Sequence, residues 1–190
     1  MEVIRLPLPT AFGALYATFC EGTEREQSAR VHALLETVLP EYAKACGVTL
    51  PHALQYAKTE MGKPYLPDCA VHFNLSHCKG LGVCLLSPRE CGADTEPVRK
   101  LREGVVRRVY DEQERKALAE SAEPDLLFTR LWTLKEAYVK AIGTGISYPM
   151  REVGFRLDGD EIRCTRSDAV FWQTVHDGFV VSVCVLKTEY

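Results

Sequence analysis

LWTLKEAYVK, residues 131–140, is the most informative segment of this sequence, and it is followed by GTG at residues 143–145. At about 100° per residue, the apolar side chains of this region share one helical face, which we expect to be buried. Those side chains are Leu127, Leu131, Leu134, Tyr138 and Ile142. Gly143 and Gly145 are typical of a helix end. The stretch therefore predicts an amphipathic helix that ends near residue 142.

A second line of side chains on this helix combines an aromatic ring with charges of both signs. Trp132, Glu136 and Lys140 recur every four residues, and Lys135 lies beside them. A carboxylate between two ammonium groups suits the binding of a phosphate ester and of the metal ion that neutralises it. The alternative is a solvated helix face with one Glu–Lys pair, which contributes only about 0.2–0.5 kcal/mol.

The composition is that of a folded globular chain. Of 190 residues, 46% are hydrophobic and 26% are charged, which argues against disorder. The net charge of -3 lacks the basic excess that non-specific duplex binding needs, so we expect no nucleic-acid partner. One basic run, residues 98–108, has five Lys and Arg residues against one acid. This run is either the wet side of a helix or a docking patch for an acidic partner.

Targeting signals and cysteine spacing bear on the compartment. The N-terminus has no basic segment followed by an apolar one, and no stretch approaches the roughly 20 apolar residues that span a bilayer. The eight cysteines form no C-x-x-C pair, so we expect free thiols rather than a disulfide framework or a structural zinc site. We therefore expect a cytoplasmic protein without membrane contact.

The remaining pattern alternates between helices and strands. Residues 24–46 predict a helix in which Pro40 is a potential interruption. Residues 98–142 predict further helical structure. Strands are expected at residues 56–67 (followed there by a loop), 71–77, 81–86, 91–96, 151–158, 161–166, 169–175 and 179–187. This order predicts an α+β fold with an antiparallel sheet.

Two acids in one of these strands predict a metal site. Asp94 and Glu96 are two residues apart, so both carboxylates point to the same face. Adjacent like charges need a positive partner, and magnesium binds a few carboxylates together with water and phosphate oxygens. The alternative is an exposed strand edge that is kept charged. Gly92 and Pro97 confine the pair to a short segment, which favours the metal site.

Three further side chains are suited to phosphate. Lys63 lies between Gly62 and Pro64 in a restrained loop, and Ser76 and His77 end an alternating strand. An ammonium, a hydroxyl and an imidazole can each donate to phosphate oxygens.

Four ordered blocks together carry a family resemblance. They are residues 62–66 (GKPYL), 73–77 (FNLSH), 92–96 (GADTE) and 132–140 with 143–145. The chain resembles the 4'-phosphopantetheinyl transferase superfamily, and more closely its surfactin-synthetase type, a holo-[acyl-carrier-protein] synthase. The resemblance implies two similar α+β halves packed as a pseudo-dimer within one chain, which is expected to work as a monomer. We place the halves at residues 1–88, with the coenzyme A contacts, and 89–190, with the metal and catalytic residues.

The resemblance also implies an activity. Such an enzyme moves the 4'-phosphopantetheine arm of coenzyme A to a serine of an apo carrier protein and releases adenosine 3',5'-bisphosphate. Coenzyme A would be the substrate, Mg²⁺ the cofactor and an acidic acyl or peptidyl carrier protein the partner. Glu136 would join Asp94 and Glu96 on the metal.

The same resemblance assigns the other site residues. Lys140 would act in catalysis, and Glu114 would be the general base, with Glu112 as the alternative. The side chains implied in coenzyme A binding are Arg30, Lys63, Pro64, Ser76, His77, Lys135 and Lys140, of which Lys135 and Lys140 would lie near the pyrophosphate. Thr95 and Cys78 depart from the commoner Ile or Val and Ser at these positions.

Two other functions use the same residues. A metal-dependent phosphodiesterase or nuclease could be built on the three acids, but a nucleic-acid groove should be basic. A non-catalytic coenzyme A-binding module would have no use for the metal ligands.

Overall fold

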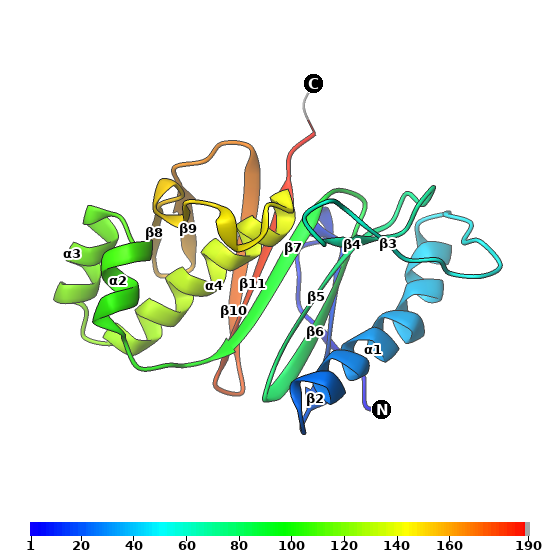
Figure 1. Cartoon of the computed structure of the whole chain (residues 1–190), viewed down its shortest axis with the longest axis horizontal. Helices are drawn as coiled ribbons and strands as arrows, with labels where there is room; N and C mark the ends of the chain where they lie inside the picture. Colours follow the sequence, from blue (N-terminus) through cyan, green and yellow to red (C-terminus); the bar gives the residue numbers. More distant parts are fainter. Residues whose placement is uncertain (189–190) are drawn as a thin grey trace.

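The computed structural model of the chain describes residues 1–188 and shows two antiparallel sheets, each covered by a long helix (Figure 1). The first sheet has the order β1-β2-β6-β5, with β1 at Ile4–Leu6, β2 at Ala14–Cys20, β5 at His72–Cys78 and β6 at Gly80–Ser87. The second has the order β10-β11-β7, with β7 at Cys91–Pro97, β10 at Ala169–His176 and β11 at Phe179–Leu186.

Two short hairpins and the helices complete the fold. The hairpins are β3 (Ala57–Lys58) with β4 (Pro64–Tyr65) and β8 (Phe155–Asp158) with β9 (Glu161–Cys164). The helices are α1 (Glu24–Ala45), α2 (Glu103–Val109), α3 (Glu112–Glu120) and α4 (Pro124–Ile142), with 3-10 turns at Thr10–Phe12, Gly145–Ser147 and Met150–Glu152. The predicted α+β fold with two helix-covered halves is confirmed. The division at residue 88 stays a prediction.

The core lies between the sheets and beneath each helix. Leu15 and Val83 of the first sheet are fully buried in one cluster with Ala93 and Val183 of the second, so the two sheets pack against each other. A second apolar cluster joins α1 to the outer face of the first sheet. A third joins α4 to the outer face of the second. Because both faces of each sheet are covered, the strands are rich in apolar residues.

Helix α1 runs through Pro40, which the sequence marked as a potential interruption. Thr23 and Glu26 form a reciprocal capping box at its start, which satisfies backbone donors of the first turn. Pro40 removes one backbone hydrogen bond, yet the helix continues to Ala45. Leu39 and Ala43 are buried in the α1 cluster, and this packing holds the last turns in place.

The strand predictions were incomplete near the N-terminus. The structure adds β1 and β2, which were not expected, and it replaces the strand expected within residues 56–67 by the β3–β4 hairpin. In β2, four of the first five side chains are buried, on both faces, so the period-2 alternation that marks a half-exposed strand is lost.

Helix α4 follows its prediction closely. Leu131, Leu134 and Tyr138 are at most 1% exposed. Gly143 caps the helix in the left-handed region, with φ of 73°, where a residue without a Cβ is favoured. The buried face and the end of this helix are therefore confirmed.

The two sheets meet at their edge strands β5 and β7, a junction that we call the seam. Asn74 Oδ1 accepts a hydrogen bond from Ala93 N at 2.9 Å, and Ser76 Oγ accepts one from Thr95 N at 3.3 Å. These side chains bridge the strands in place of a backbone ladder. Helices α1 and α4 lie on either side of the seam (Figure 1). Within residues 1–188, no helix has both the length and the apolar character needed to cross a bilayer.

Candidate active site

Helix α4 approaches the seam closely because β7 carries a glycine beneath it. A Cβ at Gly92 would lie 2.1 Å from the Ala137 carbonyl oxygen and 2.5 Å from Ala141 N. No side chain fits in this space, so the backbones of helix and strand pack directly together. This contact brings the half-buried line of Trp132, Glu136 and Lys140 on α4 over the alternate residues of β7 that face it.

A lysine, a serine and an aspartate form the centre of the site. Lys140 Nζ lies 2.6 Å from Asp94 Oδ1 and donates to Ser76 Oγ at 3.0 Å and to the Ala93 carbonyl at 3.2 Å. Ser76 Oγ in turn donates to Asp94 Oδ1 at 3.0 Å. Three segments far apart in sequence therefore meet here, and the roles predicted for Lys140, Ser76 and Asp94 stay predictions.

Two more carboxylates complete what we call the acidic cluster, which consists of Asp94, Glu96 and Glu136. Burial and the neighbouring Asp94 carboxylate raise the pKa of Glu96 to about 7, and the Arg99 guanidinium, which contacts Glu96, opposes this shift. Burial and Asp94 also raise the pKa of Glu136. The three acids thus lie near enough to repel one another, which is expected of partly buried like charges.

The acidic cluster has the chemistry that a divalent cation requires. Asp94 Oδ2 is buried and has no hydrogen-bond partner among the described residues. An unsatisfied buried acceptor costs about 1–3 kcal/mol, more when charged, so a ligand for it is expected. As placed, however, no three Asp, Glu, His or Cys side chains of residues 1–188 enclose a metal position. A bound cation would have to replace Lys140 as the partner of Asp94 and Arg99 as the partner of Glu96.

His77 lies next to this centre. It is half-buried, and its Nδ1 is 3.4 Å from Gln27 Oε1 of α1. Burial, and then the charge of Lys140, lower the pKa of His77, so the ring is neutral near pH 7. Arg30 is exposed on the next turn of α1. Sequence reasoning did not find Gln27, because no motif surrounds it.

Lys63 reaches the C-terminal end of α4 from the β3–β4 hairpin. Its Nζ donates to the Ala141 carbonyl at 2.7 Å and to Glu90 Oε2 at 2.5 Å. Glu90 Oε1 lies 3.1 Å from His72 Nδ1. The hydrogen bonds from His72 and Lys63 lower the pKa of Glu90 to about 2. Pro64 follows as the first residue of β4.

Glu90 was missed by the sequence analysis. It occurs in a turn signal, Ser87-Pro-Arg-Glu90, and is 27 residues from its partner Lys63. No local spacing relates the two. The predicted phosphate ligand Lys63 is therefore bound by a carboxylate that no sequence pattern assigns to it.

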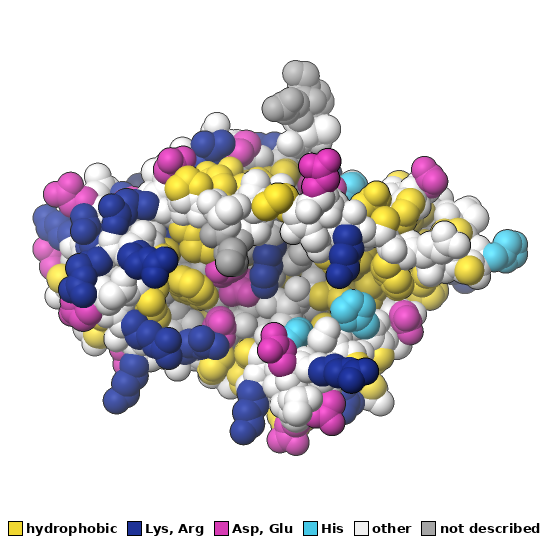
Figure 2. Space-filling model, viewed as in Figure 1, with side chains coloured by type: hydrophobic (Ala, Val, Ile, Leu, Met, Phe, Trp, Pro, Cys, Tyr) yellow, Lys and Arg dark blue, Asp and Glu magenta, His cyan; other side chains and the backbone are white. Residues whose placement is uncertain are grey.

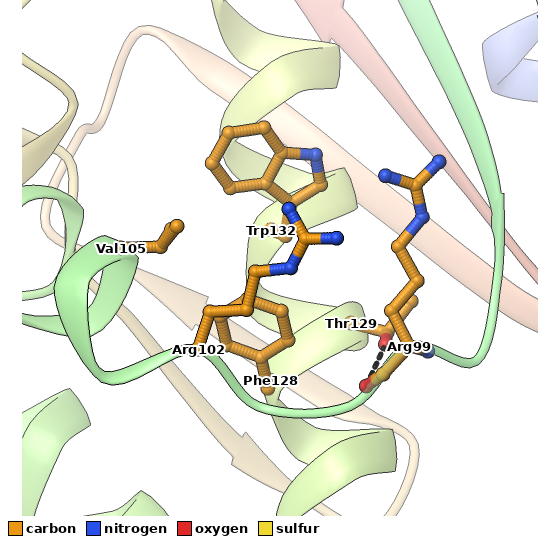
Figure 3. Close-up of a pocket in the computed structure, with 6 residues that line it drawn as sticks. All are labelled: Arg99, Arg102, Val105, Phe128, Thr129 and Trp132. Carbon is orange, nitrogen blue, oxygen red and sulfur yellow. Dashed lines mark hydrogen bonds between the residues drawn. The ribbon is translucent and has the colours of Figure 1, made fainter.

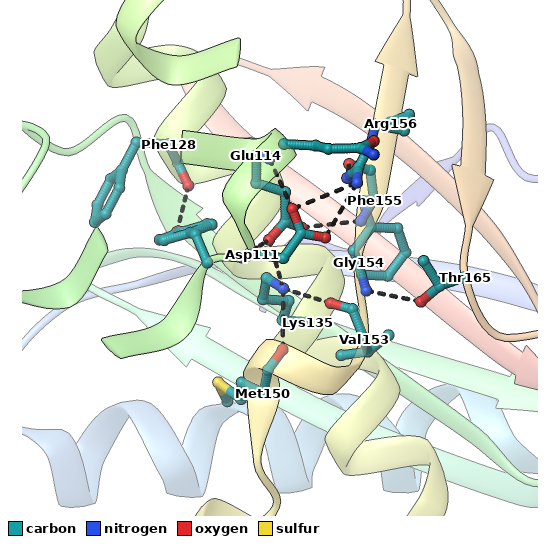
Figure 4. A network of polar contacts seen from close by, with 12 residues as sticks. Asp111, Glu114, Phe128, Lys135, Met150, Val153, Gly154, Phe155, Arg156 and Thr165 are labelled. Atoms are coloured by element: carbon teal, nitrogen blue, oxygen red, sulfur yellow. Dashed lines mark hydrogen bonds and ion pairs between the residues drawn. The ribbon is translucent and has the colours of Figure 1, made fainter. Parts of the chain in front are cut away.

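Two predicted site residues form a separate buried pair (Figure 4). Lys135 Nζ lies 2.9 Å from Glu114 Oε2, and both side chains are fully buried. Lys135 also donates to the Met150 carbonyl at 3.0 Å and to the Val153 carbonyl. The three donors of the ammonium group thus have three acceptors.

Both carboxylate oxygens of Glu114 also have hydrogen-bond partners. Its Oε2 accepts from Asp111 N at 2.8 Å as part of a capping box, and its Oε1 accepts from Phe155 N at 2.9 Å. The aromatic rings of Tyr110 and Phe155 lie 5.5 and 6.0 Å from the ammonium of Lys135. This environment excludes water and fixes both charges.

These positions bear on two predictions, which stay predictions. The structure does not bring Glu114 and Lys135 to the acidic cluster, so it supports neither a general base at Glu114 nor a pyrophosphate contact at Lys135. We assign the pair to holding α3, α4 and the start of β8 together. Glu112, the alternative base, is exposed on the first turn of α3.

Known proteins match the chain over the region that contains the acidic cluster. The family model of the 4'-phosphopantetheinyl transferase superfamily matches residues 90–184, half of the chain. A 4'-phosphopantetheinyl transferase of Bacillus subtilis is 32% identical over 122 residues, covering 62% of this chain and 54% of the relative. The transferase Sfp of Bacillus subtilis (strain 168) is 29% identical over 146 residues, covering 72% and 65%.

Two further comparisons are more limited. The transferase gsp of Aneurinibacillus migulanus is 35% identical over 97 residues, covering 50% of this chain and 40% of the relative. The solved holo-[acyl-carrier-protein] synthase of Thermotoga maritima has a TM-score of 0.46 at 24% identity and covers 53% of this chain and 64% of that one.

The chain spans about half the length of the curated relatives it matches. The predicted superfamily and its surfactin-synthetase type are confirmed by these relatives. Because the family match covers half of the chain and includes the whole acidic cluster, the chain belongs to the 4'-phosphopantetheinyl transferase superfamily.

Proposed function

We propose that this chain transfers the 4'-phosphopantetheine group of coenzyme A to a serine of an apo carrier protein, with Mg²⁺ as cofactor. The observation that carries the proposal is the convergence of Asp94 and Lys140 on Ser76, beside Glu96 and Glu136. Family membership supplies the reaction class. The released product would be adenosine 3',5'-bisphosphate.

Mg²⁺ fits the acidic cluster because Asp94 Oδ2 is a buried acceptor without a partner among residues 1–188. Asp94, Glu96 and Glu136 would hold the ion. When bound, it would neutralise charge on the pyrophosphate of coenzyme A.

Lys140 would supply a second positive charge. In the structure its Nζ contacts Asp94 and Ser76, and about a third of its side chain is exposed. It can therefore turn toward a phosphate oxygen at the seam. There it would stabilise charge that develops on the leaving phosphate as the bond from phosphorus to the bridging oxygen breaks. The serine oxygen would bond to phosphorus and lose its proton to a carboxylate base.

Coenzyme A would lie across the seam between the two halves. Ser76 of β5 contacts Lys140 directly, and His77 is near enough for the charge of Lys140 to lower its pKa, which supports their predicted contacts. Lys63 with Pro64, and Arg30 on α1, would extend the contacts toward the 3'-phosphate and the nucleotide. Lys63 would first have to exchange Glu90 for a phosphate oxygen.

The partner would be an acidic acyl or peptidyl carrier protein. The basic residues of the run at 98–108 are all exposed, and Lys and Arg side chains gather near α2 on the face shown in Figure 2.

Both halves contribute to one site, which supports a monomer. Eight free thiols support a reducing, cytoplasmic location.

One experiment separates this proposal from its alternatives. The chain is incubated with coenzyme A, Mg²⁺ and a panel of apo carrier proteins, and each carrier is examined by intact mass. We expect at least one carrier to gain the arm, and Glu136→Gln to abolish the gain while circular dichroism stays unchanged. A phosphodiesterase would cleave the nucleotide without modifying a carrier, and a binding module would do neither.

A further inference from the structure

Lys63 and Glu90 form an ion pair in the wall of a cavity at the C-terminal end of α4. The cavity has a volume of about 480 Å³ and lies between the turn of the β3–β4 hairpin and Gly143. Lys63 Nζ lies 2.5 Å from Glu90 Oε2 and donates to the Ala141 carbonyl at 2.7 Å. Two of the three donors of this ammonium group are therefore already used.

The backbone of Lys63 is fixed by its neighbours in the hairpin. Lys63 N donates to Thr59 Oγ1 at 3.1 Å, and the Lys63 carbonyl accepts from Thr59 N at 2.9 Å. The stem of its side chain passes close to Gly143, where an added Cβ would lie 3.2 Å from Lys63 Cδ. The Lys63 side chain is 11% exposed, whereas that of Glu90 is 48% exposed. Of the two partners, Glu90 is therefore the one with room to move.

The positive charge of Lys63 is already matched by negative partners. Glu90 neutralises it, and the Ala141 carbonyl belongs to the negative end of the α4 dipole. Hydrogen bonds from His72 and Lys63 hold the pKa of Glu90 at about 2, so its carboxylate is ionised at neutral pH. A phosphate that approaches Lys63 thus meets a carboxylate of the same sign as its own charge. It can pair with the ammonium group only when that carboxylate leaves.

The arginines beside the first half of α4 are too far away to replace Lys63. Arg99 and Arg102 stand close to Phe128 (Figure 3). Phe128 precedes Ala141 by 13 residues, which corresponds to about 20 Å along a helix. These guanidinium groups therefore cannot bind a phosphate that Lys63 holds at the C-terminal end of α4.

We propose that Glu90 competes with the 3'-phosphate of coenzyme A for Lys63, and thereby sets how strongly the chain discriminates coenzyme A from its 3'-dephospho form. The inference rests on the proposed function and names a residue that controls selection of its nucleotide substrate. When the phosphate binds, the pair of Lys63 and Glu90 breaks and the half-exposed carboxylate turns into water. Because one ion pair is lost as another forms, the 3'-phosphate contributes less to affinity than an unpaired lysine would allow.

Binding of two nucleotides to the same variant tests the competition. The Kd values of coenzyme A and of 3'-dephospho-coenzyme A are measured by isothermal titration calorimetry, with Mg²⁺ and without a carrier protein. Glu90→Gln keeps the shape of the side chain but removes its charge, so Lys63 becomes free to pair with phosphate. The variant should bind coenzyme A about five- to tenfold more tightly than wild type, while the Kd of the dephospho form stays within about twofold.

Two controls separate competition from general effects of charge. Glu60→Gln removes the same charge from an exposed residue that lines the same cavity, and it should change each Kd by no more than about twofold. In a Lys63→Met background, Glu90→Gln should no longer tighten the binding of coenzyme A, because the group for which Glu90 competes is gone. Far-UV circular dichroism of each variant shows that the protein titrated is folded.

The sign of the change decides between competition and a structural role. If Glu90 only supports the fold, Glu90→Gln should weaken the binding of both nucleotides, and that result would overturn the inference. Equal tightening of both nucleotides, or tightening that persists without Lys63, would overturn it as well. If wild type binds coenzyme A and modifies a carrier but Glu90→Gln behaves as Glu60→Gln does, the inference fails alone. If wild type binds no coenzyme A, the proposed function itself fails.

Discussion

Gly92 shows how one residue sets the geometry of the site. It is the position at which β7 allows the backbone of α4 to come into contact, and this contact sets Lys140 against Asp94. The glycine was noted in the sequence only as a flank of the acid pair. Its actual role depends on a helix some 45 residues away, which no local pattern reveals.

Replacing Gly92 tests this role. In Gly92→Ala the new Cβ would meet the Ala137 carbonyl oxygen at 2.1 Å, so α4 must shift. We expect a loss of about 1–3 kcal/mol in the free energy of unfolding, measured with urea, and a large loss of transfer activity. Gly104→Ala is the control, because a Cβ there has no atom within 4 Å and should leave stability unchanged or slightly raised. Equal effects of the two substitutions would contradict the account.

Glu90 gives a prediction for acid stability. Its pKa of about 2 is below the unfolded value near 4.5, so its pairing with His72 and Lys63 stabilises the fold above pH 4.5. That contribution is lost as the pH falls from 4.5 toward 2. Because about half of the Glu90 side chain is exposed, we expect a modest effect.

The measurement is the free energy of unfolding of Glu90→Gln between pH 7 and pH 2. We expect the variant to be less stable than wild type at pH 7 and to approach it below pH 3. Glu60→Gln, another exposed acid, should follow the wild-type curve. A constant difference between Glu90→Gln and wild type at all pH values would show that the pairing is not what stabilises the fold.

At the scale of elements, the helices were easier to predict than the strands. Helix α4 has one buried stripe, a proline in its first turn and a glycine after its last residue, so its sequence defines its face and its end. Strand β2 was missed because burial on both faces removes the alternation on which strand prediction depends. Strand β1 has only three residues, which is too short to show a period. Pro40 does not interrupt α1, because the packing of this helix outweighs one lost hydrogen bond.

The Lys135–Glu114 pair belongs to this scale, because it joins α3 to α4. Lys135→Met would leave the fully buried Glu114 carboxylate without its counter-charge. We expect a loss of about 3–5 kcal/mol in the free energy of unfolding. Adding Glu114→Gln should recover a large part of this loss, because the unpaired charge is removed.

Activity measurements distinguish this structural role from a catalytic one. If the pair is structural, Glu114→Gln should lose stability and keep the kcat of the fraction that remains folded. A normal urea midpoint together with a kcat reduced by about 10² or more would restore Glu114 as the general base.

At the scale of the whole molecule, the candidate site forms where the two sheet edges meet at the seam. Residues of β5, β7 and α4 were each found in the sequence, and the family resemblance assigned Asp94, Ser76 and Lys140 to one active site. The contacts that hold them there are side-chain bridges between two sheet edges, such as that of Asn74. These bridges and the pairing of Lys63 with Glu90 depend on how the halves pack, which sequence spacing does not encode.

The exposed positive charges on α2 give a prediction for how a carrier protein would be recognised. Reversing Arg107 and Arg108 to Glu should slow use of an acidic carrier protein at low salt, because both side chains are exposed on α2. The KM for coenzyme A should change much less. Steady-state kinetics at 20 and 300 mM salt, where the Debye length is about 20 Å and about 6 Å, provide the comparison. Equal effects on both substrates would exclude docking at α2.

The central claim is that three acids from two segments hold one divalent cation at the seam. Manganese, which binds the same oxygen ligands as magnesium, can be located directly by its anomalous scattering in crystals grown with Mn²⁺ and coenzyme A. The account predicts one strong peak within coordination distance of the Asp94, Glu96 and Glu136 carboxylates. A coenzyme A complex without manganese there, or with Glu136 turned away from it, would contradict the claim.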